Sequence, residues 1–344
     1  MNGQFMLAEI EEQPAVFERI LRQGQERIQD VAAALSARRP RFILFVARGT
    51  SDHAALYAKY LAETQLGLPC GLVSPSTATV YDTHPRMEGV LYIAVSQSGG
   101  SPDLLEPLQR ARAAGALTLA VTNAPHSALA EAAEFHLDIL AGAERAVAAT
   151  KTYTAELLTL YLLVAALAGT AEPALDELPD RAHRMLSTRS PAAELAVRYH
   201  FAEQVVLLSR GYNYPTAREG ALKLMETSYL VAEGFSAADF VHGPIAMIEH
   251  GFPVITVVPD GPGRAALQPV LRQLGDLGAD TLIIGPPDAA GQGTVGLPLA
   301  DLGPEVLSPL LLIIPVQLLA WSLARTRGYD PDEPRGLRKV TETW

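Results

Sequence analysis

The sequence predicts an α/β fold in which helices cover both faces of parallel β-sheets, and in which this arrangement occurs twice. Short apolar runs alternate with helical segments, which is typical of parallel sheets buried on both faces. The order of segments in the first half then recurs in the second. The apolar runs 42–47 and 204–209 are both followed by an Arg-Gly pair, at Arg48 and Arg210. We therefore expect a duplicated α/β domain rather than an array of short repeats.

Periodicity and breaker residues place the elements in order. The first half predicts strands at 42–47, 71–74, 92–95, 117–122 and 135–140, and helices at 6–39, 53–65, 104–114, 127–133 and 151–168. The second half predicts strands at 204–209, 253–258 and 280–285, and helices at 216–231 and 307–328. The expected organisation is an N-terminal helical segment (1–40), a first domain (41–170), a linker (171–200), a second domain (201–328) and a C-terminal tail (329–344).

Composition excludes several classes of protein. The chain has 344 residues, of which 49% are apolar and 19% charged, so a large core is expected and disorder is not. A formal net charge of −11 argues against a nucleic-acid partner. It also means that an anionic ligand must be held by local donors rather than by the field of the whole protein. Cys70 is the single cysteine, so no disulfide framework is expected.

The apolar segments favour a cytoplasmic protein without a membrane anchor. Residues 1–13 are polar and acidic, unlike a signal peptide. The run 157–169 is too short to span a bilayer. The run 306–324 is long enough, but it contains Pro309, Pro315 and Gln317, so we expect a buried helix.

A polar loop follows the strand predicted at 92–95. It reads Ser96-Gln97-Ser98-Gly99-Gly100-Ser101 and leads directly into a helix. Backbone N–H groups and the dipole at the start of a helix favour an anion, and hydroxyls can donate to phosphate oxygens. The alternative is an ordinary strand-to-helix turn capped by serine. The equivalent loop of the second half, 258–262, has an acid and two prolines instead, so we expect only one half to bind the anion.

Three further positions are candidates for chemistry. Glu219, Lys223 and Glu226 lie at i, i+4 and i+7 and so share a helix face, where they form either an acid/base group or a solvated ion-pair stripe. His242 precedes a Gly-Pro turn that would orient its ring, although most such histidines are structural or merely exposed. Lys339 lies in the basic tail, where a solvated side chain is the simpler interpretation.

Taken together and in order, these motifs resemble a known family. They are Arg48-Gly49-Thr50-Ser51, Ser96 to Ser101, Ala148-Ala149-Thr150-Lys151, Glu219 to Glu226, His242-Gly243-Pro244 and Pro334 to Lys339. From about Arg41 onward the chain resembles the tandem sugar-isomerase (SIS) domains of glucosamine-6-phosphate synthase. The resemblance implies two flavodoxin-like αβα sandwiches. The stretches 48–53 and 334–337 are most similar to the stand-alone, type II glucosamine-6-phosphate deaminases. Because the chain begins with the helices before the first sugar domain, no glutaminase domain and no ammonia source are expected.

The resemblance also implies roles for individual residues. The sugar phosphate would be held by Ser51, Ser96, Gln97, Ser98 and Ser101, with Thr50 and the backbone near Val147 beside the sugar. Glu226 would be the base and Lys223 would assist it. His242 would promote ring opening from the neighbouring subunit, so a homodimer is implied, and Lys339 would reach the sugar carbonyl. The chain departs from the synthase at Arg48 (cysteine there), Ala149 (serine there) and Ser101 (threonine there).

The expected reaction is that of an amino-sugar phosphate deaminase, in which glucosamine 6-phosphate and water give fructose 6-phosphate and ammonia. No metal ion and no redox cofactor is expected to take part. Three alternatives stay open at this point: an enzyme acting on a related amino sugar or fructosamine phosphate, a phosphosugar isomerase that releases no ammonia, and a sugar-phosphate sensor. Finding Glu226, Lys223, His242 and Lys339 together argues against the sensor, which would need only the serine loop.

Overall fold

The computed structural model describes residues 2–339, which form two compact units. The first-sheet unit comprises residues 15–144, 151–173 and 338–339. The second-sheet unit comprises residues 2–14, 145–150 and 174–337. Both units therefore contain segments that are distant in the sequence.

The first-sheet unit is built on five parallel strands in the order β2-β1-β3-β4-β5. The strands are β1 (Phe42–Val46), β2 (Cys70–Leu72), β3 (Val90–Ser96), β4 (Leu117–Thr122) and β5 (Phe135–Asp138). Every residue of β3 and β4 is buried, which explains why these strands are apolar without alternation. Ile93 pairs with Phe45 on one side and with Leu119 on the other.

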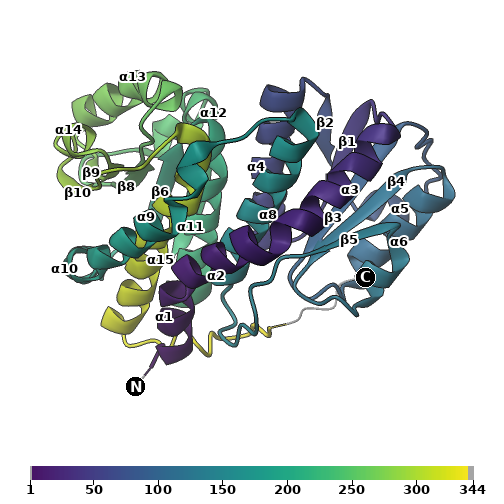
Figure 1. Ribbon diagram of the computed structural model, residues 1–344. Coiled ribbons are helices and arrows are strands. Elements are labelled where there is room, and N and C mark those ends of the chain that lie inside the picture. Colours follow the sequence, from purple (N-terminus) through teal and green to yellow (C-terminus); the bar gives the residue numbers. More distant parts are fainter. Residues whose placement is uncertain (1, 340–344) are drawn as a thin grey trace. The chain divides into compact units, whose positions relative to one another are not determined.

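Helices lie on both faces of this sheet (Figure 1). The helices are α2 (Gln13–Arg19), α3 (Gln25–Ala37), α4 (Thr50–Leu61), α5 (Ser76–Thr79), α6 (Pro102–Ala113), α7 (Ala128–Ala132) and α8 (Lys151–Ala168), with π-helical turns at Ile20–Gly24 and Ala62–Leu66. Helices α3 and α4 both pack on α8, whereas α5 and α7 pack on α6. The result is the three-layer αβα sandwich expected from the sequence.

The second-sheet unit has the same topology. Its parallel strands are β6 (Gln204–Ser209), β7 (Val231–Ser236), β8 (Pro253–Val257), β9 (Asp280–Gly285) and β10 (Val295–Pro298). Their order, β7-β6-β8-β9-β10, matches the first sheet strand for strand. Its helices are α1 (Gln4–Glu11), α9 (Leu178–Met185), α10 (Arg189–Tyr199), α11 (Tyr214–Ser228), α12 (Ala237–Val241), α13 (Pro262–Asp276), α14 (Pro287–Ala290) and α15 (Ser308–Thr326), with 3₁₀ turns at Pro173–Leu175, Leu186–Thr188, Gly211–Asn213, Pro244–Met247 and Glu305–Leu307.

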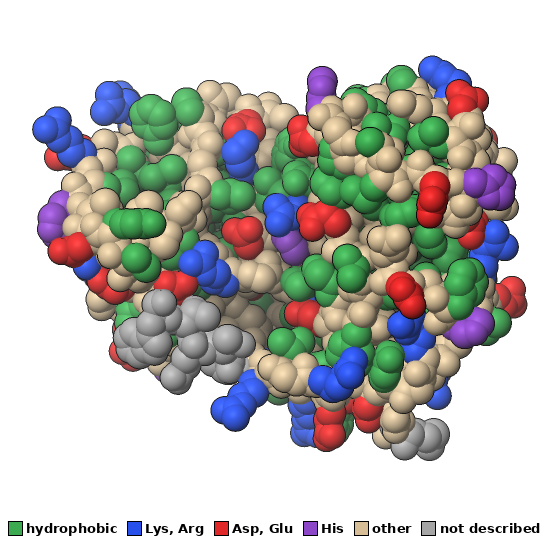
Figure 2. Space-filling model, turned by 180° about the vertical axis from the view of Figure 1, so that it is seen from behind, with side chains coloured by type: hydrophobic (Ala, Val, Ile, Leu, Met, Phe, Trp, Pro, Cys, Tyr) green, Lys and Arg blue, Asp and Glu red, His purple; other side chains and the backbone are tan. Residues whose placement is uncertain are grey.

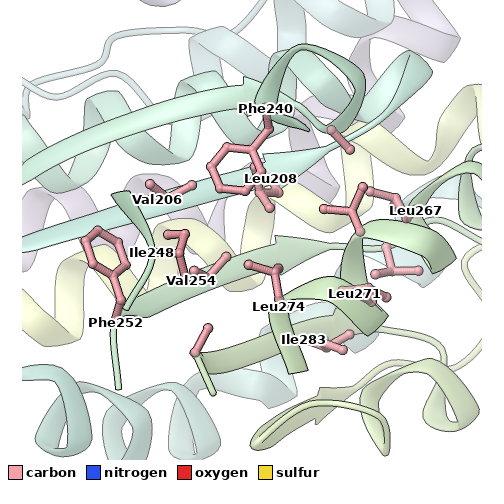
Figure 3. Packing of buried hydrophobic residues seen from close by; sticks show 14 of the residues in the cluster. Val206, Leu208, Phe240, Ile248, Phe252, Val254, Leu267, Leu271, Leu274 and Ile283 are labelled. Carbon is pink, nitrogen blue, oxygen red and sulfur yellow. The ribbon is translucent and has the colours of Figure 1, made fainter. Parts of the chain in front are cut away.

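One core of this unit lies between its sheet and the helices α12 and α13. Figure 3 shows Leu208 of β6 and Val254 of β8 packed with Phe240 of α12 and Leu267 of α13. Phe240 and Leu267 are fully buried. Burial of such side chains contributes roughly 1.5–3 kcal/mol each.

The units differ from the predicted domain bounds. The predicted linker, 171–200, contains α9 and α10, and α10 packs on α15 within the second-sheet unit. The N-terminal segment 1–40 is divided between the units near residue 14. The prediction also lacked the edge strands β7 and β10. The tail 329–344 is described as far as Lys339, and its last five residues lie outside the described part of the chain.

Two segments are long and apolar enough to cross a membrane by length and composition. They are Lys151–Ala168, which is 83% buried in the structure, and Glu305–Thr326, which is 94% buried. A helix that is apolar all round is typical of a protein core as well as of a membrane.

Candidate functional site

The order of the first sheet marks the position where a ligand is expected. Between β1 and β3 the direction of winding reverses, and open α/β sheets bind ligands beyond the carboxyl ends of the strands at such a switch point. The loops that leave these two strands are 47–49 and 97–101. The second of them is the serine loop, so the sheet topology and the sequence motif indicate the same place.

The serine loop folds tightly over its own side chains. The N–H of Gly99 donates to Ser96 Oγ at 3.1 Å, and that of Gly100 donates to Ser98 Oγ at 3.4 Å. Gly99 has a φ of 61°, and a Cβ atom there would lie 2.1 Å from Ser127 Oγ. Only glycine fits this position, for both conformational and steric reasons.

Ser101 occupies the N-cap of α6, but its side chain makes no capping hydrogen bond. In an ordinary capped turn the hydroxyl would accept from an N–H group of the first helical turn. The helix that follows is 12 residues long and begins with Pro102. The start of α6 therefore keeps its attraction for an anion, and this favours the anion-site interpretation over the capped turn.

The other side of the switch point is the start of α4, which carries Thr50 and Ser51. Ser51 is buried, and its Oγ donates to Glu156 Oε1 of α8 at 2.8 Å. A hydroxyl has one proton, so in this arrangement Ser51 can offer another group only its lone pairs. To donate to a phosphate, as the resemblance implies, it must first turn away from Glu156.

Glu144 connects the tail to the same unit. Its side chain is fully buried and accepts from the backbone N–H of Thr152 at 3.1 Å and from Thr152 Oγ1 at 2.7 Å. Lys339 Nζ donates to the same carboxylate at 2.7 Å. This ion pair holds Lys339 near the start of α8, so its side chain is not merely solvated.

The second-sheet unit contains the acid/base candidates, on α11. The ammonium of Lys223 lies 2.5 Å from Glu226 Oε2 and 3.2 Å from Glu219 Oε1. The side chains of Lys223 and Glu219 are fully buried, whereas Glu226 is 21% exposed. The arrangement is therefore not a solvated stripe, and Glu226 is the member of the group that a substrate can reach.

The charge on Lys223 is fixed by its neighbours. Burial by itself would lower the pKa of Lys223, but the attraction and hydrogen bonds of Glu219 and Glu226 outweigh burial and raise that pKa. The lysine stays protonated at neutral pH and cannot act there as a nucleophile. Its ammonium lies within ion-pair distance of both carboxylates, so the cation stabilises their negative charge.

Two glycines set the position of α11. A Cβ atom on Gly220 would lie 2.7 Å from side-chain atoms of Leu207 and Val316, and one on Gly234 of β7 would lie 2.5 Å from the Cα of Arg218. The helix therefore packs against its sheet and α15 more closely than any larger residue would allow.

The remaining predicted residues of this unit lie on loops. His242 follows α12 and is exposed. Val147 is half-buried, and the two backbone N–H groups before it, of Arg145 and Ala146, donate to the carboxylate of Glu9 on α1. The buried side chain of Glu9 thus fixes the loop that the resemblance assigns to the sugar.

The equivalent switch point of the second sheet is filled by the chain itself. Gly263, in the first turn of α13, donates its N–H to Glu305 Oε2 at 3.0 Å. A Cβ atom on Gly261 would lie 2.3 Å from the same carboxylate. An internal acid therefore occupies the helix start where the first sheet has its serine loop, which agrees with the prediction that only one half binds an anion.

The structure thus brings the predicted residues into two groups. The first-sheet unit holds Thr50, Ser51, Ser96, Gln97, Ser98, Ser101 and Lys339, and the second-sheet unit holds Val147, Lys223, Glu226 and His242. The sequence reasoning missed Glu144, Glu156 and Glu9. Apart from Thr152, which lies close to Glu144 in the sequence, the partners of these glutamates are more than a hundred residues away. No spacing rule predicts such pairs, and only the apolar residues around each glutamate could have drawn attention to it.

Charged side chains of both signs are interspersed over the face in Figure 2. The described residues on this face form no extended positive patch. This agrees with the net charge of −11 and leaves recognition to local donors such as those of the serine loop.

Comparison with known proteins identifies the family. The SIS domain profile matches residues 38–166 and 199–287, which is more than half of the chain. The chain belongs to the SIS domain family. The first matched stretch contains every strand of the first sheet, and the second contains β6, β7, β8 and β9 of the second sheet but not β10.

The relatives within this family act on sugar phosphates. The glutamine–fructose-6-phosphate aminotransferase (isomerizing) of Methanothermobacter thermautotrophicus is 37% identical over 340 residues, covering 97% of this chain and 57% of that protein. This chain therefore spans little more than half the length of that relative. A solved structure from Silicibacter pomeroyi, whose assignment as a phosphosugar isomerase is provisional, is 35% identical with a TM-score of 0.88, covering 96% of this chain and 100% of that one. The C-terminal domain of the Francisella tularensis glucosamine-fructose-6-phosphate aminotransferase is 28% identical with a TM-score of 0.84, covering 96% and 98%.

Proposed function

We propose that this SIS protein is an aldose–ketose isomerase of hexose 6-phosphates, and specifically a glucosamine-6-phosphate deaminase. The observation that carries the proposal is the group on α11. A partly exposed carboxylate, Glu226, is paired with a fully buried lysine, Lys223, which is also paired with the buried Glu219. A base held in this way suits the removal of a proton from a carbon next to a carbonyl.

The proposed chemistry begins with ring opening, assigned to His242, which exposes the aldehyde at carbon 1. Glu226 takes the proton from carbon 2, which bears the amine, and returns it to carbon 1. The product is an imine at carbon 2, and water hydrolyses it to fructose 6-phosphate and ammonia. Lys339 is assigned to the sugar carbonyl and the serine loop to the phosphate, whose binding contributes positioning energy remote from the reacting carbons.

Two lines support the choice of an amino sugar. The stretches 48–53 and 334–337 resemble those of the stand-alone deaminases. In addition, the name of the Methanothermobacter relative joins an amino-group transfer to fructose 6-phosphate, and the deaminase reaction connects the same two kinds of compound. A cytoplasmic location is part of this proposal, because hexose phosphates are intracellular metabolites.

The direct test is ammonia release from glucosamine 6-phosphate by wild type, Glu226→Gln and Glu233→Gln. Glu233 is an exposed carboxylate on β7 of the same unit, so its variant is the matched control. We expect Glu226→Gln to lose roughly 10²–10⁴-fold in kcat, which is the usual contribution of general-base catalysis. It should still bind fructose 6-phosphate within about threefold of wild type, since the base contributes little to ground-state binding.

Unchanged turnover in Glu226→Gln would remove the base assignment. If the protein interconverts aldose and ketose phosphates but releases no ammonia from glucosamine 6-phosphate, the isomerase proposal stands and the deaminase proposal is wrong. Galactosamine 6-phosphate and fructosamine 6-phosphate belong in the same assay as the alternative substrates.

The proposed homodimer has a test of its own. We propose that His242 acts in the site of the neighbouring subunit. Each site would then combine Glu226 of one chain with His242 of the other. Mixed dimers of the two inactive variants, Glu226→Gln and His242→Ala, would then contain one intact site in each pair. Random exchange should restore about a quarter of wild-type activity, as follows from twofold symmetry. If His242 acts within its own chain, mixing restores nothing.

A further inference from the structure

An arginine and an aspartate join the two loops of the first switch point. Arg48 is the second residue after β1, and Asp103 lies in the first turn of α6, two residues after Ser101. Arg48 Nε donates to Asp103 Oδ2 at 3.0 Å, and its Nη2 donates to the same oxygen at 2.6 Å. The two residues are 55 apart in the sequence.

The burial of the two partners is unequal. The side chain of Asp103 is only 7% exposed, whereas that of Arg48 is 47% exposed. The other carboxylate oxygen of Asp103 accepts from Thr79 Oγ1 at 3.3 Å. This is therefore not an ordinary surface ion pair, since a buried carboxylate here depends on its cationic partner.

The position of Asp103 conflicts with the binding of an anion. An acid in the first turn stabilises a helix through the dipole. The same negative charge lies beside the serine loop, where it would repel a phosphate dianion. Arg48 removes the conflict, because it neutralises the acid and leaves the helix dipole and the serine hydroxyls to act on the ligand.

We propose that Arg48 is a positioning residue for the phosphate site, which makes the start of α6 receptive to a phosphate monoester dianion by neutralising Asp103. This inference rests on the proposed function only through the presence of a phosphate site. Sequence resemblance places a cysteine at this position in glucosamine-6-phosphate synthase, so the pairing distinguishes this chain from that enzyme. Arg48 acts through Asp103.

The test is a double-mutant cycle read by calorimetric titration with inorganic phosphate and with fructose 6-phosphate. The proteins are wild type, Arg48→Gln, Asp103→Asn and the double variant. We expect Arg48→Gln to weaken phosphate binding roughly 10- to 100-fold, because the negative charge of Asp103 then faces the dianion without the positive charge of the guanidinium. Asp103→Asn should bind within about threefold of wild type or more tightly, and the double variant should regain most of the loss.

Salt and turnover provide readouts that a merely structural defect would not give. The loss in Arg48→Gln should shrink as the ionic strength rises, because screening weakens the repulsion. It should be seen in KM, with kcat for ammonia release changed less than about threefold, because the phosphate is remote from the reacting carbons. Thermal melting of each variant shows whether it folds. If Arg48→Gln does not fold, Arg48→Lys, which keeps the charge, is the second variant.

The matched control is Arg110→Gln, on the same helix as Asp103; Arg110 pairs with the exposed Asp82 and with Glu106. It makes the same change in net charge and should leave phosphate affinity unchanged. Equal affinity in Arg48→Gln and wild type, or a double variant that binds no more tightly than Arg48→Gln, would overturn the inference. Wild type that fails to bind phosphate at all would instead remove the phosphate site and the proposed function with it.

Discussion

Replacing Lys223 with methionine would test the electrostatic argument for α11 most directly. The substitution leaves two carboxylates without their shared cation. The side chain of Glu219 is fully buried, whereas Glu226 is 21% exposed and can still reach water. Breaking a buried ion pair by removing one partner costs about 3–5 kcal/mol. We expect the free energy of unfolding at pH 7.5 to fall by this amount, with Glu219 as the dominant contribution.

The loss should depend on pH in a defined direction. In wild type the pKa of Lys223 is raised, so its contribution to stability is present below the ordinary lysine pKa and is lost only as pH rises through the raised one. In wild type, the contribution of Lys223 to the free energy of unfolding is therefore constant between pH 5 and 7.5. In the variant a buried carboxylate without its cation has a raised pKa, and protonation relieves it. The deficit should therefore shrink as pH falls toward 5.

The assay is urea unfolding followed by the fluorescence of Trp321, which lies in α15 of the same unit, in a Trp344→Phe background. Arg184→Met is the matched control, because Arg184 lies in the same unit as Trp321. Arg184 pairs with Asp301, but their side chains are 50% and 45% exposed, so we expect a loss of at most about 1 kcal/mol. A deficit in Lys223→Met below about 1 kcal/mol, or one that does not change with pH, would refute the reasoning.

Three further predictions concern other parts of the chain. Ser98→Ala combined with Ser101→Ala should raise KM for the sugar phosphate roughly tenfold or more with little change in kcat, because hydrogen bonds to a charged group are lost. Steady-state kinetics measures both constants, and an unchanged KM would contradict the phosphate site. Burial raises the pKa of the Cys70 thiol to about 11, so alkylation by iodoacetamide at pH 8 should be much slower than for a free thiol and should accelerate only toward pH 11; rapid labelling at pH 8 would contradict this. Glu305→Ala should lower the free energy of unfolding by about 1 kcal/mol, and Glu305→Gln by less, because the carboxylate caps the start of α13 through Gly263; urea titrations that show no difference among the three proteins would argue against that role.

The sequence predicted the strands of the first sheet and the central strands of the second, but it missed the second sheet's edge strands, β7 and β10. Strands β3 and β4 are buried on both faces and therefore read as continuous apolar runs. Strand β7 contains Gly234, which is required because the backbone of α11 comes too close for a side chain. Strand β10 contains Gly296, where a Cβ would lie 2.5 Å from the carbonyl oxygen of Ala290, and ends at Pro298. These residues weaken strand propensity, and an edge strand tolerates them.

For the candidate site, local spacing determined what could be known in advance. The face shared by Glu219, Lys223 and Glu226 follows from helical periodicity. The loop from Ser96 to Ser101 is predicted to be an anion site because a strand ends and a helix begins there. The order of the motifs also identified the family, which the SIS domain match confirms.

Only the tertiary structure decided how these groups are charged and held. That Lys223 is fully buried while Glu226 is not depends on packing around α11, and periodicity alone cannot distinguish this from a solvated stripe. The pairs Arg48–Asp103 and Lys339–Glu144 join residues 55 and 195 positions apart. Their partners are set by which strands are neighbours in the sheet and by where the tail returns. The sequence thus determined the local chemistry of each segment, and the long-range packing determined which charges neutralise one another.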